Sequence, residues 1–366
     1  MKTPVMYLAI KQFLMQASFK TGLTSVLHFT WPAGRHDGTI MIYHSVNHGT
    51  DYPFLPSQMR VSPTCFDQQM AYLARSCQVI RLNELGRTVR NCSKLPFRAV
   101  ALTFDDGFKD NLTYALPILS KYGFTATFFV VTEWVGARQL SWLHRLYYLV
   151  WLKPADEVVN EFLHELRLMG HPGELEPGLF RRYGAGGTLR HLLLNKVTPT
   201  QADSIANAMW KRMAPMSTNE ERELAGRLYL SWSDIDRLVS AGMDIGCHTA
   251  SHPKLPLLSG SALQAEIARS SIELEERLGK SVGAFSYPFG NPDSFNDECR
   301  WVLHRIGFEV ACALVGGSGR PGQDPLALGR LPVEDVSQAD FALEITGLLG
   351  SLRMARSRLR MVWSKD

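Results

Sequence analysis

The sequence has no long apolar segment, no closely spaced cysteine pair and no large excess of charge of either sign. No run approaches the ~18–20 apolar residues of a membrane-spanning helix. Lys2, Lys11 and Lys20 interrupt the N-terminal segment, and no small-residue cleavage site follows, which argues against a secretory signal. None of the six cysteines forms a CxxC pair, so we expect reduced, partly buried thiols. These absences predict a cytoplasmic protein.

What the sequence does contain is an alternation of strand and helix patterns over 366 residues, of which 45% are hydrophobic and 20% charged. That composition is typical of a globular protein, and a formal net charge of +4 gives no reason to expect nucleic-acid binding. Strands are predicted at 38–46, 98–106, 125–131, 241–248, 282–290, 308–314 and 326–333. Helices are predicted at 62–77, 110–123, 260–279 and 294–307. About seven alternating strands indicate an α/β fold, a distorted (β/α)7-type barrel.

Three regions depart from this alternation. Residues 1–37 are predicted to be an N-terminal helical segment, and 337–366 a basic C-terminal helix. Within the barrel, which we place at 38–336, residues from about 133 to 230 carry tryptophan, leucine and charge at helical spacing and predict a mainly helical insertion.

The C-terminal tail has a basic, amphipathic pattern. Its arginines alternate with Leu, Met and Trp363; they are Arg353, Arg356, Arg358 and Arg360. Such a segment can lie on an anionic lipid surface, which would place the protein peripherally at the membrane. The alternative is the solvated face of a terminal helix that packs on the barrel.

Ionisable residues follow two of the predicted strands. Asp105 and Asp106 end the strand in "AVALTFDDGF", and His248 and His252 follow another strand in "GCHTASHPKL". In parallel α/β folds the carboxyl ends of the strands meet at one face, where catalytic groups gather. One carboxylate and two imidazoles with open positions suit a divalent metal that activates water. The second carboxylate could then remain free as a general base.

These stretches resemble a known family. "TFDDGF" and "HTASH" are similar to the first two motifs of the NodB-homology polysaccharide deacetylases, carbohydrate esterase family four, and "IMIYHSV" resembles the opening strand of the exopolysaccharide-linked branch. The resemblance implies a distorted barrel that removes acetyl groups from N-acetylated sugars with a divalent metal, usually Zn2+, with Co2+ or Ni2+ as alternatives. It implies Asp105 as the general base and Asp106, His248 and His252 as metal ligands.

The later motifs of the family are only partly present. "FSYPFG" keeps Tyr287, Pro288, Phe289 and Gly290, which the resemblance implies as substrate-binding residues, with a backbone N–H near Tyr287 stabilising the oxyanion. Ser286 stands where the family has an arginine that pairs with the base. Trp142 offers a further aromatic face for sugars, although a place in the core of the insertion is the simpler interpretation.

The last motif, "LGRLPV", has Arg330 where the family has a histidine that acts as general acid. Two replacements are open. His44, at the end of the first strand, could line the site as the acid, or be a strand-end histidine bonded to backbone. Arg330 could instead pair with Asp105 and take over the role of orienting it.

The main hypothesis is therefore a metal-dependent hydrolase that removes N-acetyl groups from an amino-sugar glycan, or from its lipid-linked precursor, in polysaccharide biosynthesis. An O-acetyl esterase or a non-sugar amidase could use the same site. A non-catalytic glycan-binding scaffold is the third hypothesis, favoured by the two replaced motif residues. Against it, neighbouring carboxylates repel each other unless a metal is bound.

Overall fold

The computed structural model describes residues 37–172, 179–316 and 319–345. The predicted N-terminal helical segment up to residue 36 and the basic tail at 351–365 lie outside these residues. Of the predicted C-terminal helix, one segment is described, α14 (Gln338–Ile345). Within the described ranges, no helix is both long enough and apolar enough to cross a lipid bilayer.

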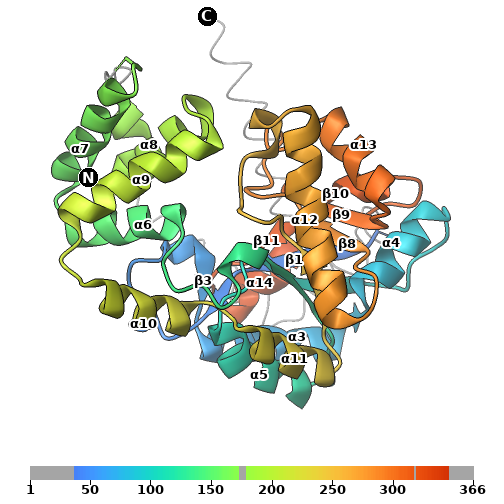
Figure 1. Cartoon of the computed structure of the whole chain (residues 1–366). Coiled ribbons are helices and arrows are strands. Elements are labelled where there is room, and N and C mark those ends of the chain that lie inside the picture. Colours follow the sequence, from blue (N-terminus) through green and yellow to red (C-terminus); the bar gives the residue numbers. More distant parts are fainter. Residues whose placement is uncertain (1–36, 173–178, 317–318, 346–366) are drawn as a thin grey trace, which may run out of the picture.

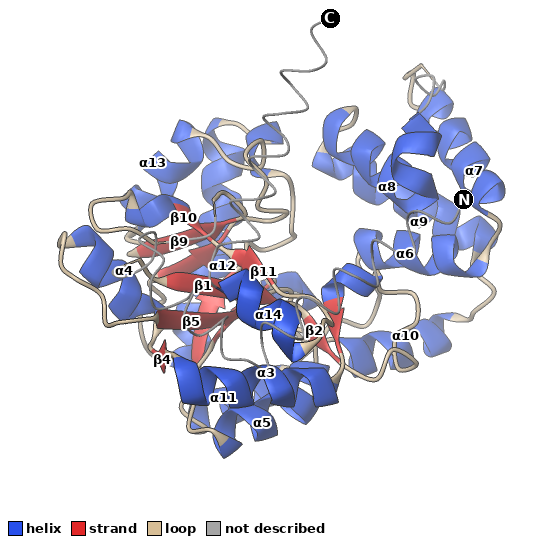
Figure 2. Cartoon of the chain, turned by 180° about the vertical axis from the view of Figure 1, so that it is seen from behind, coloured by secondary structure: helices blue, strands red, loops and turns tan. Residues whose placement is uncertain are grey.

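A curled parallel sheet forms the centre of the molecule (Figure 2). Along the sheet its strands run in the order β10–β9–β8–β7–β6–β5–β1–β11. In chain order they are β1 (Thr39–Tyr43), β5 (Ala99–Phe104), β6 (Thr127–Val130), β7 (Asp244–Cys247), β8 (Ala284–Ser286), β9 (Val310–Ala313), β10 (Leu328–Gly329) and β11 (Leu331–Pro332). Only Arg330 separates β10 from β11, so one short segment pairs with both ends of the sheet and nearly closes it. Counting that segment once, the (β/α)7-type barrel predicted from sequence is confirmed.

Smaller strands and turns connect these elements. β4 (Gln78–Val79) pairs with the start of β5, and β2 (Ser45–Val46) pairs with β3 (Arg60–Val61) in a separate ribbon. Short 3₁₀ turns are η1 (Ser57–Met59), η3 (Thr132–Trp134), η4 (Leu255–Leu257) and η5 (Pro325–Ala327). All six residues of β5 are buried, as expected for a strand covered on both faces.

Helices surround the barrel. They are α3 (Pro63–Ser76), α4 (Leu82–Arg90), η2 (Asn111–Ala115, a π-helical turn), α5 (Leu116–Lys121), α11 (Trp232–Ser240), α12 (Gly260–Leu278) and α13 (Asp297–Ile306), with α14 beside α3. The four helices predicted from sequence are present. α4 was not predicted, because Gly86 in its middle lowers helix propensity. The structure explains this glycine, since a Cβ there would come within 2.9 Å of Val310 on β9.

Five helices between β6 and α11 make up the insertion and gather at one side of the barrel (Figure 1). They are α6 (Trp142–Leu152), α7 (Ala155–Leu168), α8 (Leu179–Asn195), α9 (Pro199–Met213) and α10 (Thr218–Leu228). These helices bury an apolar core of their own, with Phe162 and Met209 fully enclosed. A buried ion pair between Arg145 and Glu221 joins α6 to α10. Trp142 belongs to this core, as its simpler interpretation predicted.

Candidate active site

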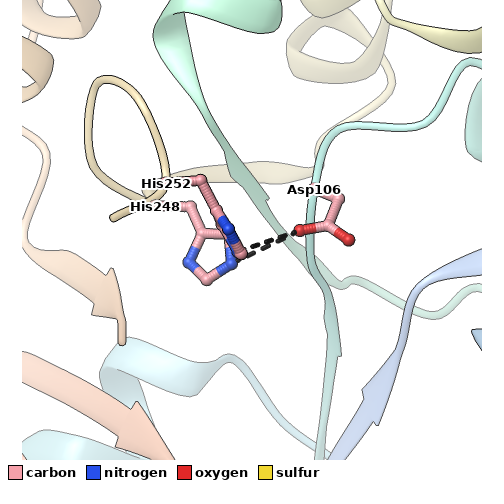
Figure 3. A group of neighbouring side chains, drawn as sticks. All are labelled: Asp106, His248 and His252. Carbon is pink, nitrogen blue, oxygen red and sulfur yellow. Dashed lines mark ion pairs between the residues drawn. The ribbon is translucent and has the colours of Figure 1, made fainter. Parts of the chain in front are cut away.

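Three predicted ligands meet at the carboxyl ends of β5 and β7, the strands on either side of β6. Asp106 follows β5, and His248 and His252 lie on the loop after β7. Both imidazoles point at the same carboxylate oxygen (Figure 3): the Nε2 atoms of His248 and His252 lie 3.5 and 3.6 Å from Oδ1 of Asp106. All three side chains are buried, and the potential ligand atoms lie within 4.8 Å of one another.

The chemistry of this group fits a divalent cation. Ligand atoms that each lie about 2 Å from a zinc ion are themselves roughly 3 to 3.5 Å apart, close to the two distances to Asp106. The Nδ1 of His248 is 2.7 Å from the Ser286 carbonyl oxygen, which fixes the tautomer that leaves Nε2 free to bind a metal. Asp106, Thr249 and His252 adopt positive φ angles, so the loops are held in uncommon conformations that aim the ligands inward.

The charges of the group support each other. Burial by itself would raise the pKa of Asp106, but the neighbouring His248 and His252 hold it below its ordinary value. Burial would lower the pKa of His248, yet the carboxylates of Asp105 and Asp106 raise it. For His252, burial and the neighbouring His248 lower the pKa to about 3, so this imidazole is neutral and able to coordinate a metal.

Asp105 lies beside the three ligands but has a different partner. Its two carboxylate oxygens accept hydrogen bonds from Nη1 and Nη2 of Arg330, each at 2.7 Å. Ser286 completes the arrangement: its Oγ donates to Asp105 at 3.0 Å and lies 2.8 Å from Nη2 of Arg330. Burial would raise the pKa of Asp105, but Arg330 and His248 keep it below its usual value. The carboxylate is therefore ionised at neutral pH.

Arg330 reaches this position because of the way the barrel closes. It is the single residue between β10 and β11, and its backbone N–H donates to the carbonyl of Ala313 on β9. Its side chain is 1% exposed. The pairing with Asp105 left open by the sequence is therefore present. Ser286, on β8, and Arg330, on the closing strand, share the place for which the family motif uses one arginine.

His44 follows the end of β1 and is half-buried. The pKa of His44 lies below its ordinary value, chiefly because the side chain is buried. The nearby carboxylates of Asp106 and Asp105 act against this shift, and Arg330 adds to it. These influences place the imidazole within electrostatic reach of Asp105, Asp106 and Arg330. Ser45, the next residue, is hydrogen-bonded to the buried carboxylate of Asp110, which holds the loop after β1.

The Tyr-Pro-Phe-Gly loop differs from expectation in one respect. Tyr287 was predicted to contact substrate, but it is fully buried, its ring stacks on Phe295, and its hydroxyl donates to the Leu326 carbonyl. Its N–H donates to Cys312, so that N–H is not free for an oxyanion. This prediction is wrong because β8 extends its sheet pairing through Tyr287. Of the four predicted residues, Phe289 is the one whose side chain is partly exposed.

Phe289 lies against the candidate metal ligands, with its ring centroid 4.7 Å from that of His252. Its φ of 65° and that of Gly290, 67°, turn the chain sharply after Pro288. A Cβ on Gly290 would come within 2.9 Å of Leu314, so this turn requires glycine. Pro288 and Gly290 therefore shape the loop, and Phe289 presents the aromatic surface.

A family comparison agrees with this geometry. A family model described as polysaccharide deacetylase matches residues 93–176 and 188–311, more than half of the sequence. The chain belongs to the polysaccharide deacetylase family. The match begins before β5 and ends within β9, so it includes the segments with Asp105 and Asp106 and with His248 and His252, and most of the helical insertion.

Individual relatives are consistent with the exopolysaccharide-linked branch of these deacetylases. The poly-beta-1,6-N-acetyl-D-glucosamine N-deacetylase of Escherichia coli (strain K12) is 30% identical over 146 residues, which are 37% of this chain and 20% of that protein. YxkH of Bacillus subtilis (strain 168) is 28% identical over 167 residues, 45% of this chain and 47% of YxkH. The matched part of the chain thus spans less than half the length of these curated relatives.

Solved structures share the fold. The Streptococcus pyogenes deacetylase PplD in complex with acetate superposes with a TM-score of 0.54 at 18% identity, over 85% of this chain and 98% of that one. IcaB from Ammonifex degensii gives a TM-score of 0.53 at 19% identity, over 86% and 98%. At these identities the similarity shows the barrel architecture that the chain has in common with both.

Sequence reasoning missed the contribution of the insertion to the site. Trp134, in η3, lies with its ring centroid 5.1 Å from that of His252. At the other end of the insertion, two backbone hydrogen bonds tie the chain to the loop after β5. The N–H of Leu230 donates to the carbonyl of Gly107, and the N–H of Lys109 donates to the carbonyl of Leu228. The loop that carries Asp105 and Asp106 is therefore held partly by residues far away in sequence, for which no local pattern exists.

Proposed function

We propose that the chain is a metal-dependent N-deacetylase of an amino-sugar glycan. The observation that carries this proposal is the convergence of three potential ligand atoms, from Asp106, His248 and His252. Beside them the carboxylate of Asp105 is ion-paired with Arg330 and does not belong to the ligand group. Such an arrangement separates a cation site from a base. A divalent metal, which we take to be zinc because two imidazoles and one carboxylate suit it, would polarise the acetamide carbonyl and lower the pKa of water there.

The roles of the other residues follow from their positions. Asp105, ionised and oriented by Arg330, would take a proton from the attacking water. His44, within electrostatic reach of Asp105 and Asp106, would deliver a proton to the sugar nitrogen as acetate leaves. Because the Tyr287 N–H is engaged and Pro288 has none, the next backbone donor is that of Phe289, which we assign to the developing oxyanion.

The test combines metal content with acetate release. Purified protein is expected to hold about one divalent ion per chain and to release acetate from N-acetylglucosamine oligomers. Asp106→Ala and His248→Ala should lose both properties. Asp156→Ala and His164→Ala, at exposed positions on α7, are matched controls that should retain both. A chain that binds no metal even after addition of zinc, cobalt or nickel would exclude the proposal and favour a glycan-binding scaffold.

The bond cleaved needs a separate experiment. An O-acetyl esterase or an amidase acting on a non-sugar amide would use the same groups, since each reaction passes through a tetrahedral oxyanion. A panel of N-acetylated sugars, O-acetylated sugars and simple acetamides, compared by kcat/KM, distinguishes them. The proposal requires the N-acetylated sugars to be the best substrates.

The location of the reaction is a further part of the proposal. We place the protein in the cytoplasm, peripherally at the membrane, acting on a lipid-linked saccharide, because the tail at 351–365 combines four arginines with apolar residues. Recovery of the whole protein in the soluble fraction at low salt would contradict membrane contact. In that case, removal of the tail would also leave the amount of soluble protein unchanged.

A further inference from the structure

One cation of the insertion stands beside the active site without a described counter-ion. Arg190 lies near the end of α8, is half-buried, and places its guanidinium carbon 5.3 Å from the centroid of the Phe289 ring. That ring is the one in contact with His252. Among the described residues, no carboxylate lies within ion-pair distance of Arg190, although the pKa of Asp293 is lowered by its hydrogen bond with Lys254 and also by the charge of Arg190. A planar, permanently charged group is therefore held over the aromatic surface next to the ligands.

A small pocket opens beside this guanidinium. Its volume is about 260 Å³, and its walls come from α8 and from the loops that follow His252 and Phe289. The charged and titratable groups in its lining are Arg190, His191, Lys254 and Asp293. His191 is engaged with the side chain of Asn195. The pocket thus joins the insertion to both loops of the active site.

The charges of the pocket do not cancel. Asp293 is the one carboxylate in its lining, and it accepts a hydrogen bond from Lys254 at 2.6 Å. Lys254 also donates to Asn195 on α8, so its ammonium is already satisfied by groups of the protein. Arg190 is left with its donors directed at no described acceptor, and a guanidinium of this kind binds carboxylate or phosphate through two parallel hydrogen bonds.

Arg190 is also near enough to the reacting centre to contact the same substrate. The Phe289 ring links the two places, because its centroid lies 4.7 Å from that of His252 and 5.3 Å from the guanidinium carbon of Arg190. A sugar whose acetamide lies at the metal group would extend past Phe289 toward α8. An acidic substituent on that sugar, or on its neighbour, would then meet the guanidinium.

From this geometry we infer that Arg190 is a specificity-determining residue that binds an anionic group, carboxylate or phosphate, on the saccharide substrate. The inference rests on the proposed function and adds to it the substrate class, an acidic glycan. The cation–π contact with Phe289 holds the guanidinium beside the pocket without neutralising its charge.

Direct binding tests the inference without requiring turnover. Metal-loaded full-length Asp105→Asn protein is titrated calorimetrically with N-acetylglucosamine, with its 6-phosphate, and with a disaccharide of N-acetylglucosamine and glucuronate. We expect at least one acidic probe to bind roughly tenfold more tightly than the neutral sugar, which corresponds to about 1.4 kcal/mol. The preference should weaken with added salt. The probe that shows it identifies phosphate or carboxylate as the group bound.

Variants assign the effect to the guanidinium. Arg190→Ala should reduce the preference to about onefold, and Arg190→Lys should keep part of it, because the charge remains but the two-pronged geometry is lost. Lys211→Ala, which removes one positive charge from an exposed position on α9, is the matched control and should keep the full preference. Near-ultraviolet circular dichroism checks that the Arg190 variants fold.

Two results would overturn the inference. One is equal binding of neutral and acidic probes to the parent protein, and the other is a preference that persists in Arg190→Ala. Its failure is distinguishable from failure of the proposed function. Acetate release with equal kcat/KM from acidic and neutral sugars would leave the deacetylase and remove the acidic subsite. An Arg190-dependent preference without acetate release would keep the acidic subsite and remove the proposed deacetylase activity.

Discussion

Replacement of Arg330 by methionine tests the arrangement around the base most directly. Arg330 and Asp105 form a two-pronged ion pair, and their side chains are 1% and 4% exposed. Removal of one partner from such a buried pair costs about 3 to 5 kcal/mol, because the remaining charge loses its compensation. Ser286 still donates to Asp105, so we expect the lower end, about 3 kcal/mol, for Arg330→Met at pH 7.

The loss should depend on pH with a defined sign. In the parent protein Arg330 keeps the pKa of Asp105 below its ordinary value, so this carboxylate stabilises the fold above about pH 4 and stops doing so as the pH falls through the lowered pKa. In Arg330→Met, burial raises the pKa of Asp105 without that opposition. The difference in unfolding free energy between the two proteins should therefore be large at pH 7 and shrink toward acid pH.

Two assays measure these effects. Urea unfolding at pH 7 and near pH 4 gives the stability difference, and the pH profile of kcat/KM should show its acidic limb displaced to higher pH in Arg330→Met. Arg330→Lys, which keeps the charge but not the two-pronged geometry, should fall between the two proteins. A variant within about 0.5 kcal/mol of the parent at pH 7, with an unmoved acidic limb, would refute the assignment of Arg330 as the partner that positions the base.

Three further predictions concern other parts of the site. His44→Gln should lower kcat for acetate release by roughly 10²–10⁴-fold with little change in KM if His44 donates the proton; an unchanged kcat would exclude that role. Burial raises the pKa of Asp110 to about 7 despite hydrogen bonds from Ser45 and Asn47. As the pH rises from about 4 to 7, the unfolding free energy of the parent should therefore fall by up to about 1.4 kcal/mol per pH unit relative to that of Asp110→Asn; parallel stability curves for the two proteins would contradict this. Chelation of the metal should lower the thermal unfolding midpoint of the parent but not that of His248→Ala, and equal shifts in both would place the bound metal elsewhere.

The residues with the chemistry could be recognised from the sequence because their pattern is local. A continuous apolar strand ends in Asp105 and Asp106, and two histidines four residues apart follow another strand. Parallel strands in a barrel bring their carboxyl ends to one face whatever the loops between them do. For that reason the barrel class and the meeting of Asp105, Asp106, His248 and His252 followed from short segments, and so did the helices whose apolar spacing was regular.

Only the tertiary structure decided which distant groups complete the site. Arg330 meets Asp105 across 225 positions of sequence, because the strand that closes the barrel is broken at that residue. Tyr287 is removed from the substrate because sheet pairing continues through it, and Arg190 reaches Phe289 because the insertion packs beside the barrel. Periodicity in a sequence reports which face of one element is buried, but a contact between two elements depends on how both pack, and no spacing along the chain encodes that.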